Sequence, residues 1–174
     1  MTAVAGAVFT ASNWNIHLRD NLLETEVAKA SAYGQTFSGT GQNSIAARQV
    51  SQATNSGVTI LNNVPAYSDL ASVGPVVTVD TGVMALVMSS CRFVYQTSSG
   101  WYGYMSYAVS GATTRIAADG GAVGWRSTTS DQMRMTGVDL CQGLTPGTNT
   151  FTAKYRADGG PIQFQERTLT VWPF

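Results

Sequence analysis

The feature that most limits how this 174-residue chain can fold is a pair of alternating runs near its C-terminal end. In the run 148–157, apolar residues such as Phe151 and Tyr155 alternate with polar ones. Leu169 has the same kind of neighbours in the run 165–172. Because successive side chains of a strand point to opposite faces of a sheet, each run predicts a strand with one packed face and one hydrated face. The rest of the β-rich half is expected to supply partners for these strands.

Further strand-like runs fill the chain from residue 75 onward. Turn-forming Asp, Ser, Pro and Gly residues separate them, and no helical pattern lies between them. About eight short strands at this spacing predict an antiparallel β-sandwich, and the count favours a jelly-roll-like topology. The expected strands are 76–79, 83–96, 101–109, 122–127, 132–140, 148–157, 161–164 and 166–172.

A short amphipathic helix is predicted over residues 10–30. Thr10 is a suitable N-cap residue, and the segment after it carries an apolar stripe opposite polar residues. The polar stretch that follows separates the helix from the β-rich half, so it either folds back on that half or, as we favour, docks on another subunit. The predicted attachment or oligomer interface consists of Trp14, Leu18, Leu22 and Val27, with Phe174 from the apolar C-terminal end.

Between the helix and the β-rich half lies a polar stretch that is almost uncharged. Arg48 is the one charged residue in the range 31–68, and only 36–38 and 57–61 look strand-like. Such a length without structure of its own is unusual inside a compact domain, while the low charge is not typical of disorder. An extended arm ordered by neighbouring subunits and a flexible linker both fit this composition.

The charge content restricts the partners. Only 11% of residues are charged, and ten basic residues balance ten acidic ones. A nucleic-acid or anionic-membrane surface needs clustered Lys and Arg, so neither partner is expected. Neither a cleavable signal nor a membrane span is expected, because the opening residues lack a basic region and no apolar run approaches about 18 residues. A low charge fits a surface covered by other subunits, and it also fits a poorly soluble monomer.

The two cysteines, Cys91 and Cys141, lie in strand-like runs beside apolar residues. Their spacing is not that of metal ligands, so buried reduced thiols are the main interpretation. A Cys91–Cys141 disulfide remains open if the two strands pair.

Residues that could support catalysis are sparse. His17 is the one histidine and falls on the polar side of the predicted helix, where it cannot be assigned to a catalytic triad. Most acidic residues of the β-rich half adjoin turn glycines, which their turn chemistry explains. Neither a metal-ligand cluster nor a phosphate-binding loop between a strand and a helix is recognisable. We therefore expect no enzyme activity, no metal and no cofactor.

Aromatic residues gather in two neighbouring runs. Tyr102 and Tyr104 fall on one face of the strand 101–109, and Trp101 falls on the other, so not all of them can be core. Aromatic side chains are enriched in interfaces and in ligand sites alike. The aromatics assigned to a glycan-binding surface or a subunit interface are Trp101, Tyr102, Tyr104 and Trp125.

Three segments carry a resemblance to a known group of proteins. The segment 8–25, VFTASNWNIHLRDNLLET, is similar to an opening of the type LTAAQLNTHLRDNLLET, although Ser12, Asn13 and Trp14 depart from it. The segment 39–48, GTGQNSIAAR, is similar to ATGANAIAER, and 144–156, LTPGTNTFTAKYR, is similar to LTAGTHTFTLQYR. These motifs resemble small virion proteins of tailed bacteriophages that infect actinobacteria, over roughly the first third and the last fifth of the chain.

The resemblance implies a non-enzymatic virion structural protein, assembled in the bacterial host cytoplasm. Its partners would be the major capsid protein or other virion proteins, and trimers are expected. The main hypothesis is a capsid decoration or minor capsid protein that stabilises the assembled head, and the alternative is a minor tail or tail-fibre protein that binds a host glycan. The expected divisions are a helical attachment segment at 1–30, an extended polar arm at 31–74 and a β-sandwich domain at 75–174.

Overall fold

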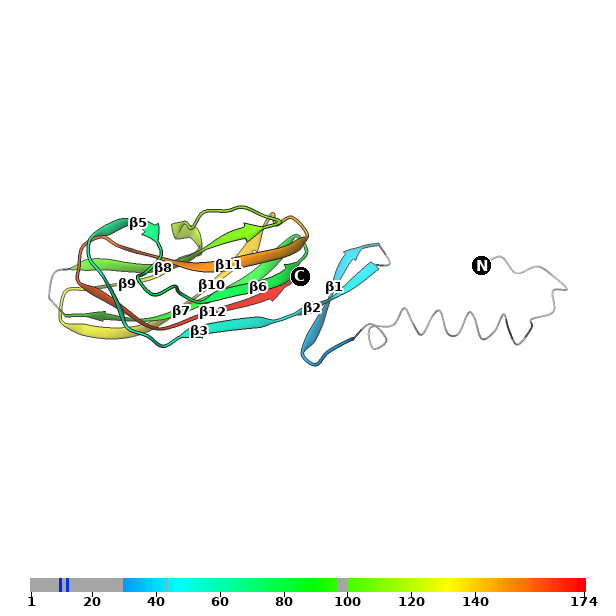
Figure 1. The fold of residues 1–174 in the computed structure, drawn as a ribbon, viewed down its shortest axis with the longest axis horizontal. Coiled ribbons are helices and arrows are strands. Elements are labelled where there is room, and N and C mark those ends of the chain that lie inside the picture. The colour runs from blue at the N-terminus through cyan, green and yellow to red at the C-terminus, as the bar shows by residue number, and fades with distance from the viewer. Residues whose placement is uncertain (1–9, 11, 13–29, 43, 97–99) are drawn as a thin grey trace. The chain divides into compact units, whose positions relative to one another are not determined.

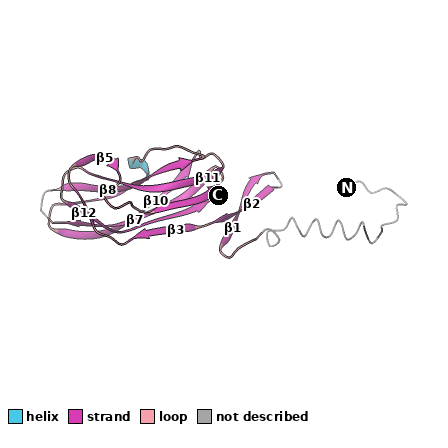
Figure 2. Ribbon diagram, in the orientation of Figure 1, coloured by secondary structure: helices cyan, strands magenta, loops and turns pink. Residues whose placement is uncertain are grey.

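The computed structural model describes residues 10, 12, 30–42, 44–96 and 100–174. These residues form mostly strands and loops, with a 3-10 turn, η1 (Asp119–Gly121), among them (Figure 2). The strands pair antiparallel, so the mainly β class predicted from the alternating runs is confirmed. The predicted helix and its residues Trp14, Leu18, Leu22 and Val27 lie outside the described residues and stay a prediction.

The chain divides into two compact units, residues 1–47 and 48–174. In the described part of the first unit, β1 (Gln35–Gly41) pairs with β2 (Ser44–Gln49), whose last residues enter the second unit. The side chains of both strands are half-buried or exposed.

The second unit holds two antiparallel sheets (Figure 1). The first has the strand order β10-β7-β12-β3. Its members are β10 (Asp131–Gln142), β7 (Met84–Tyr95), β12 (Ile162–Pro173) and β3 (Ser51–Asn55), and β4 (Thr59–Leu61) also pairs with β12. The second sheet has the order β5-β11-β8-β9. Its members are β5 (Val64–Ser68), β11 (Gly147–Ala157), β8 (Trp101–Gly111) and β9 (Val123–Ser127), and β6 (Val76–Thr81) also pairs with β11.

The connections between the sheets identify the topology. Without the short β4 and β5, the two paths are β3-β12-β7-β10 and β6-β11-β8-β9. The chain crosses repeatedly from one sheet to the other, and the late strands β11 and β12 insert between early ones. This interleaved order is that of a jelly-roll sandwich, the topology favoured by the predicted strand count.

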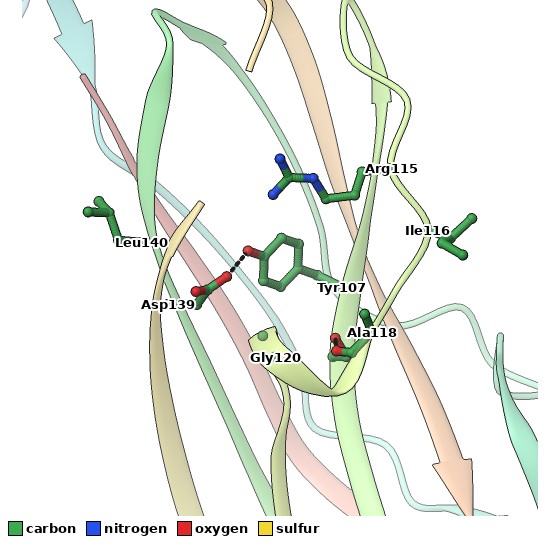
Figure 3. Close-up of a pocket in the computed structure, with 9 residues that line it drawn as sticks. Tyr107, Arg115, Ile116, Ala118, Gly120, Asp139 and Leu140 are labelled. Atoms are coloured by element: carbon green, nitrogen blue, oxygen red, sulfur yellow. Dashed lines mark hydrogen bonds between the residues drawn. The ribbon is translucent and has the colours of Figure 1, made fainter. Parts of the chain in front are cut away.

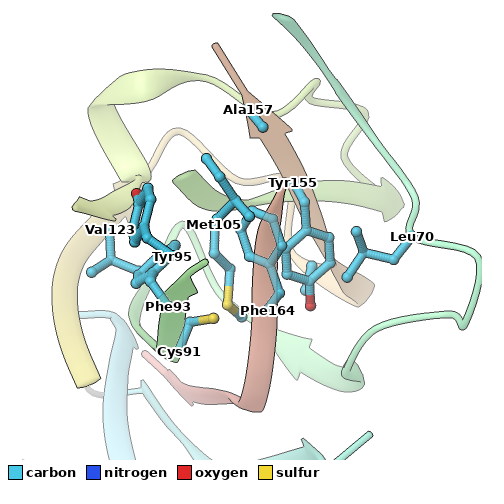
Figure 4. Close-up of a cluster of buried hydrophobic side chains, with 11 residues drawn as sticks. Leu70, Cys91, Phe93, Tyr95, Met105, Val123, Tyr155, Ala157 and Phe164 are labelled. Carbon is cyan, nitrogen blue, oxygen red and sulfur yellow. The ribbon is translucent and has the colours of Figure 1, made fainter. Parts of the chain in front are cut away.

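The core lies between the facing sheets. At one end of the sandwich, Phe93 and Phe164 of the first sheet pack edge to face at 5.5 Å between ring centroids, and Tyr155 of the second sheet packs on Phe164 at 5.2 Å (Figure 4). At the other end, Val87 and Leu169 lie in one cluster with residues of the second sheet such as Phe151. Alternation along each strand places these side chains inward, so that both sheets bury one face.

The extended arm expected at 31–74 differs from the structure, because the compact sandwich unit begins at Arg48 rather than at residue 75. Within that range β3 and β4 pair with β12, and β5 pairs with β11. Of these three strands, only β4 falls in a run, 57–61, that looks strand-like in the sequence. The reason is that β3 is held mainly by main-chain pairing at a sheet edge, and Ala53 is its one apolar residue, so the side chains give little hydrophobic pattern.

The two runs expected at 161–164 and 166–172 form one strand, β12, interrupted by a register shift. Glu166 has a φ of 46° at this bulge, and the next side chain, Arg167, points inward and is fully buried. Nη2 of Arg167 donates to Asn55 Oδ1 at 2.8 Å and to the Gly57 carbonyl at 3.1 Å. The bulge thereby ties β12 to the connection between β3 and β4.

Cys91 and Cys141 are both buried and free, as the main interpretation predicted. In the β7–β10 register Cys91 lies opposite Met135 and Cys141 opposite Ala85, so the two thiols are several residue pairs apart. A disulfide between them is therefore absent, although their strands do pair. Burial raises the pKa of the Cys91 thiol from 9.0 to about 12.

We expect both thiols to resist a thiol-specific reagent at pH 8 in the native protein and to react fully in denaturant. The raised pKa keeps Cys91 neutral in the fold, and this contribution to stability is complete below pH 9 and decreases as the pH rises toward 12. Colorimetric thiol titration measures the reaction. Fast labelling of the native protein at pH 8 would contradict the burial of the thiols.

Replacing Phe164 with alanine should lower the free energy of unfolding by about 3–5 kcal/mol, because the ring is fully buried between two aromatic neighbours. Ile116→Ala is the matched control, because this side chain is 83% exposed and its loss should change stability by less than about 0.5 kcal/mol. Chemical denaturation followed by tryptophan fluorescence compares the two. Equal losses would mean that the sandwich core is assigned wrongly.

Candidate functional site

The four aromatics assigned to a surface do not form one surface. Tyr102 and Tyr104 lie on the outer face of the second sheet, and their rings stack at 5.7 Å. Trp101 and Trp125 pack against the core cluster of Figure 4 from its border. Strand alternation predicts Trp101 on the face opposite the tyrosines, and the four residues accordingly divide between the border of the core and the outer face of the second sheet.

Both tryptophans have structural partners. A side chain on Gly159 would overlap the Trp101 ring, so this ring covers the turn between β11 and β12. The Trp125 ring meets Tyr95 edge to face at 5.1 Å. The Tyr95 hydroxyl donates to the Trp125 carbonyl and accepts from the Gly103 amide at 2.9 Å. These contacts stabilise the end of the sandwich. Neither tryptophan is left with a fully exposed ring face on which a sugar could stack.

The outer tyrosines belong to a ladder of rings and guanidinium groups. Arg126 lies 5.2 Å from the centroid of Tyr102, which stacks on Tyr104. Arg156 then lies 4.1 Å from the Tyr104 centroid and 5.5 Å from that of Tyr67. The members of this ladder come from β9, β8, β11 and β5, so it crosses the outer face of the second sheet.

Acidic side chains fix the ladder at its Arg156 end. Arg156 donates to Asp158 at 2.8 Å and to Asp119 at 3.0 Å, and the Tyr67 hydroxyl donates to Asp119 at 2.8 Å. Burial and the hydrogen bond to Asp119 raise the pKa of Tyr67 above its ordinary value. Acidic residues next to turn glycines thus serve partly as ion-pair partners across strands, beyond their turn chemistry.

The ladder limits sugar binding at Tyr102 and Tyr104. A side chain on Gly124 would overlap the Tyr104 ring, so this ring covers the glycine of the neighbouring strand. Arg156 and Tyr102 occupy further parts of the Tyr104 ring. Stacking on a sugar needs an open ring face, and the contacts of Tyr104 leave it poorly suited to that role.

Tyr104→Ala should lower the free energy of unfolding by about 1–2 kcal/mol, through loss of the ring stack and the cation–π contact. The control is Tyr33→Ala, because the Tyr33 side chain is fully exposed. Thermal denaturation of both variants tests this. An effect of Tyr104→Ala no larger than that of the control would mean that the ladder adds nothing to stability.

A second surface lies on the outer face of the first sheet. Leu86 of β7 pairs with Leu140 of β10 on one side and with Trp172 of β12 on the other. In the adjacent row, Met88 of β7 pairs with Val138. We call these five residues, which occupy two neighbouring cross-strand rows, the outer apolar row. Val138 is 63% exposed, Leu140 46% and Trp172 38%.

In one direction along the strands, the residues next to the outer apolar row are uncharged. The next cross-strand row consists of Thr136, Ser90 and Thr168. Charges begin one row further on, where Arg92 and Arg134 form ion pairs with Glu166 at 3.2 and 3.3 Å. Exposed apolar surface bordered by neutral residues is typical of an interaction site.

Phe174, predicted as an interface residue, lies beside this surface. Its amide donates to the Met84 carbonyl at 3.0 Å, and its ring stacks on Trp172 at 6.4 Å. The side chain stays 36% exposed. The C-terminal end thus packs on its own sheet and still presents aromatic surface, which leaves the predicted interface role of Phe174 open.

A pocket of roughly 280 Å3 lies between β8, β10 and the β8–β9 connection (Figure 3). The Tyr107 hydroxyl points to Asp139 and donates to its carboxylate. Arg115 donates to the Gln142 carbonyl and, at 3.1 Å, to Cys141 Sγ. Burial and the hydrogen bond to Asp139 raise the pKa of Tyr107 above its ordinary value. No sequence pattern predicts this pocket, because its residues come together only in the fold.

Among the described residues, no group of three or more His, Cys, Asp and Glu side chains could hold a metal ion. No helix within those ranges has the length and apolar character of a membrane span. His17 lies outside them.

Comparison with known proteins gives a likeness of fold. No protein-family model and no curated protein matches the chain by sequence. In a crystal structure of the viral particle of IBDV, infectious bursal disease virus, one chain is similar with a TM-score of 0.54 at 13% identity. The match covers 78% of this chain and 35% of that one, so the chain spans about a third of the protein it resembles.

Two weaker likenesses have TM-scores of 0.36 and carry no argument about function. The isomalto-dextranase of Arthrobacter globiformis is 15% identical, over 81% of this chain and 24% of the enzyme. A chain of the tripod from the baseplate of bacteriophage Tuc2009 is 12% identical, over 100% and 98% of the two chains. Structural neighbours therefore include a viral-particle protein and a phage baseplate protein, and the likeness concerns the fold.

Proposed function

We propose that the protein is a non-enzymatic structural component of a virion, and that it is a trimeric decoration or minor capsid protein on the phage head. The observation that carries this proposal is the jelly-roll sandwich, a fold shared with a chain of a viral particle at a TM-score of 0.54. The resemblance of the opening and closing segments to phage virion proteins supports the same class.

The outer apolar row is the surface that we assign to contact with another subunit. It lies on a regular sheet face and spans β10, β7 and β12, and one uncharged cross-strand row separates it from the ion pairs of Arg92 and Arg134 with Glu166. Burying an uncharged, largely apolar face avoids the desolvation cost of unpaired charges. A stable contact buries about 1,600 Å2 in total, so Phe174 and neutral neighbours such as Thr136 would belong to the contact as well.

Stabilisation of a shell follows from mass action. A protein that binds the assembled shell but not its separate subunits shifts the equilibrium toward the assembly. The predicted N-terminal helix would add a second attachment point, with Trp14, Leu18, Leu22 and Val27 as its contact residues. The homo-oligomeric contact and attachment to the capsid would then use different parts of the chain.

Light scattering coupled to size-exclusion chromatography tests the subunit contact. We expect the native chain to be an oligomer. A double variant with Val138→Lys and Leu140→Lys should weaken association at least about 100-fold, because each lysine brings an unpaired charge to the contact. The control carries Val73→Lys and Ile60→Lys, because Val73 is as exposed as Val138 (63%) and Ile60 nearly as exposed (47%) as Leu140. A monomeric native chain, or equal behaviour of the two variants, would contradict this contact.

The position of the protein on the virion, head or tail, needs a separate experiment. Immunogold labelling should mark heads, and heads assembled without the protein should release DNA at a lower temperature than complete heads. Labelling confined to tails would replace the head assignment with the alternative of a minor tail or tail-fibre protein.

A further inference from the structure

The pocket beside Tyr107 lies at an edge of the sandwich, where β10 and β9 each end the order of their sheets. The β8–β9 connection, including η1, forms one of its walls. Tyr107 is 4% exposed, its ring lies 5.8 Å from that of Phe151, and its hydroxyl donates to Asp139. Ser106, 1% exposed, donates to the Ala118 carbonyl at 2.7 Å and fixes the connection over the pocket. The walls are therefore built before any ligand arrives.

Two opposite charges face this pocket without forming an ion pair. Asp139 accepts the Tyr107 hydroxyl on Oδ2, and within the described part of the chain its Oδ1 accepts no hydrogen bond. The Arg115 guanidinium is oriented by the Gln142 carbonyl and by Cys141 Sγ, and no ion pair joins it to Asp139 among the described residues. In Figure 3 both groups lie on the same side of the pocket as the Tyr107 hydroxyl, while the Ile116 and Leu140 side chains point away.

This set of groups selects the chemistry of a ligand. A carboxylate accepts hydrogen bonds, and a guanidinium donates them. One negative and one positive group balance, so an ion of either sign would meet a like charge as well as an opposite one. A hydroxyl group can donate to the carboxylate and accept from the guanidinium at once, and neighbouring hydroxyls on a ring repeat that pattern. A pocket near the lower end of the usual range of about 300–1,000 Å3 fits one such ring.

We propose that this pocket binds a single ring of a neutral sugar, with Asp139 and Arg115 as the paired contacts to its hydroxyl groups. The pocket shares Leu140 with the outer apolar row, but Asp139 and Arg115 are not part of that row, because Asp139 lies on the inner face of β10 while the Val138 and Leu140 side chains lie on its outer face. The inference is thus independent of the proposed virion role. The ligand can be a free monosaccharide or a ring of a polysaccharide, since both present the same hydroxyls.

Saturation-transfer NMR and calorimetry with the methyl glycosides of glucose, galactose and mannose, and with N-acetylglucosamine, test the proposal on the full chain. At least one should bind saturably, and Asp139→Asn and Arg115→Gln should each weaken that binding about tenfold or more, the loss expected for a charge-assisted hydrogen bond. Asp131→Asn is the matched control, because it makes the same chemical change on the same strand at an exposed position, and it should bind as the native chain does.

Circular dichroism and thermal denaturation establish that each variant is folded, and the conservative Arg115→Lys provides a second variant if Arg115→Gln is unstable. A second experiment with a neutral polysaccharide distinguishes the two possible ligands. If the polysaccharide binds and the monosaccharide displaces it, the pocket binds a ring of a polymer. If only the monosaccharide binds, the pocket binds a free sugar. Absence of saturable binding by every probe at about 50 mM overturns the proposal, as does binding that folded Asp139→Asn and Arg115→Gln variants leave unchanged.

Discussion

The structure depends on the burial of two sheet faces against each other. Each long strand carries an inward apolar set, and the aromatic contacts among Phe93, Phe164 and Tyr155 join the first sheet to the second. Apolar burial contributes roughly 25 cal/mol per Å2 removed from water, which makes this contact the main favourable contribution to folding. Turns, edge strands and surface ion pairs all form around it.

The same alternation that builds the core also determines what each sheet presents outside. On the second sheet, the outward positions carry Tyr102, Tyr104, Arg126 and Arg156, and these side chains satisfy one another in a ladder. On the first sheet, the outward positions near the C-terminal end carry Val138, Leu140 and Trp172 next to neutral residues. One outer face is therefore occupied by its own contacts, and the other presents apolar surface to a partner.

The edge strands of the sandwich have a different role from its central strands. Main-chain pairing lets β3 and β4 extend the first sheet although their side chains are mostly polar. At the opposite edge, β10 carries Asp139 inward, where an apolar residue would be usual, and the β8–β9 connection leaves a polar pocket around it. The exception to the apolar pattern on β10 is what makes a binding site there.

The sequence by itself determined the fold class and most strands after residue 75, because alternation and turn residues are local signals that survive in a single chain. It also placed Tyr102 and Tyr104 on a face opposite Trp101. Tertiary structure alone decided that 51–68 joins the sandwich, that one bulged strand runs from Ile162 to Pro173, and that Tyr107, Arg115 and Asp139 meet. Those outcomes depend on which strands become neighbours and on main-chain hydrogen bonds between distant segments, and neither leaves a pattern in the order of side chains.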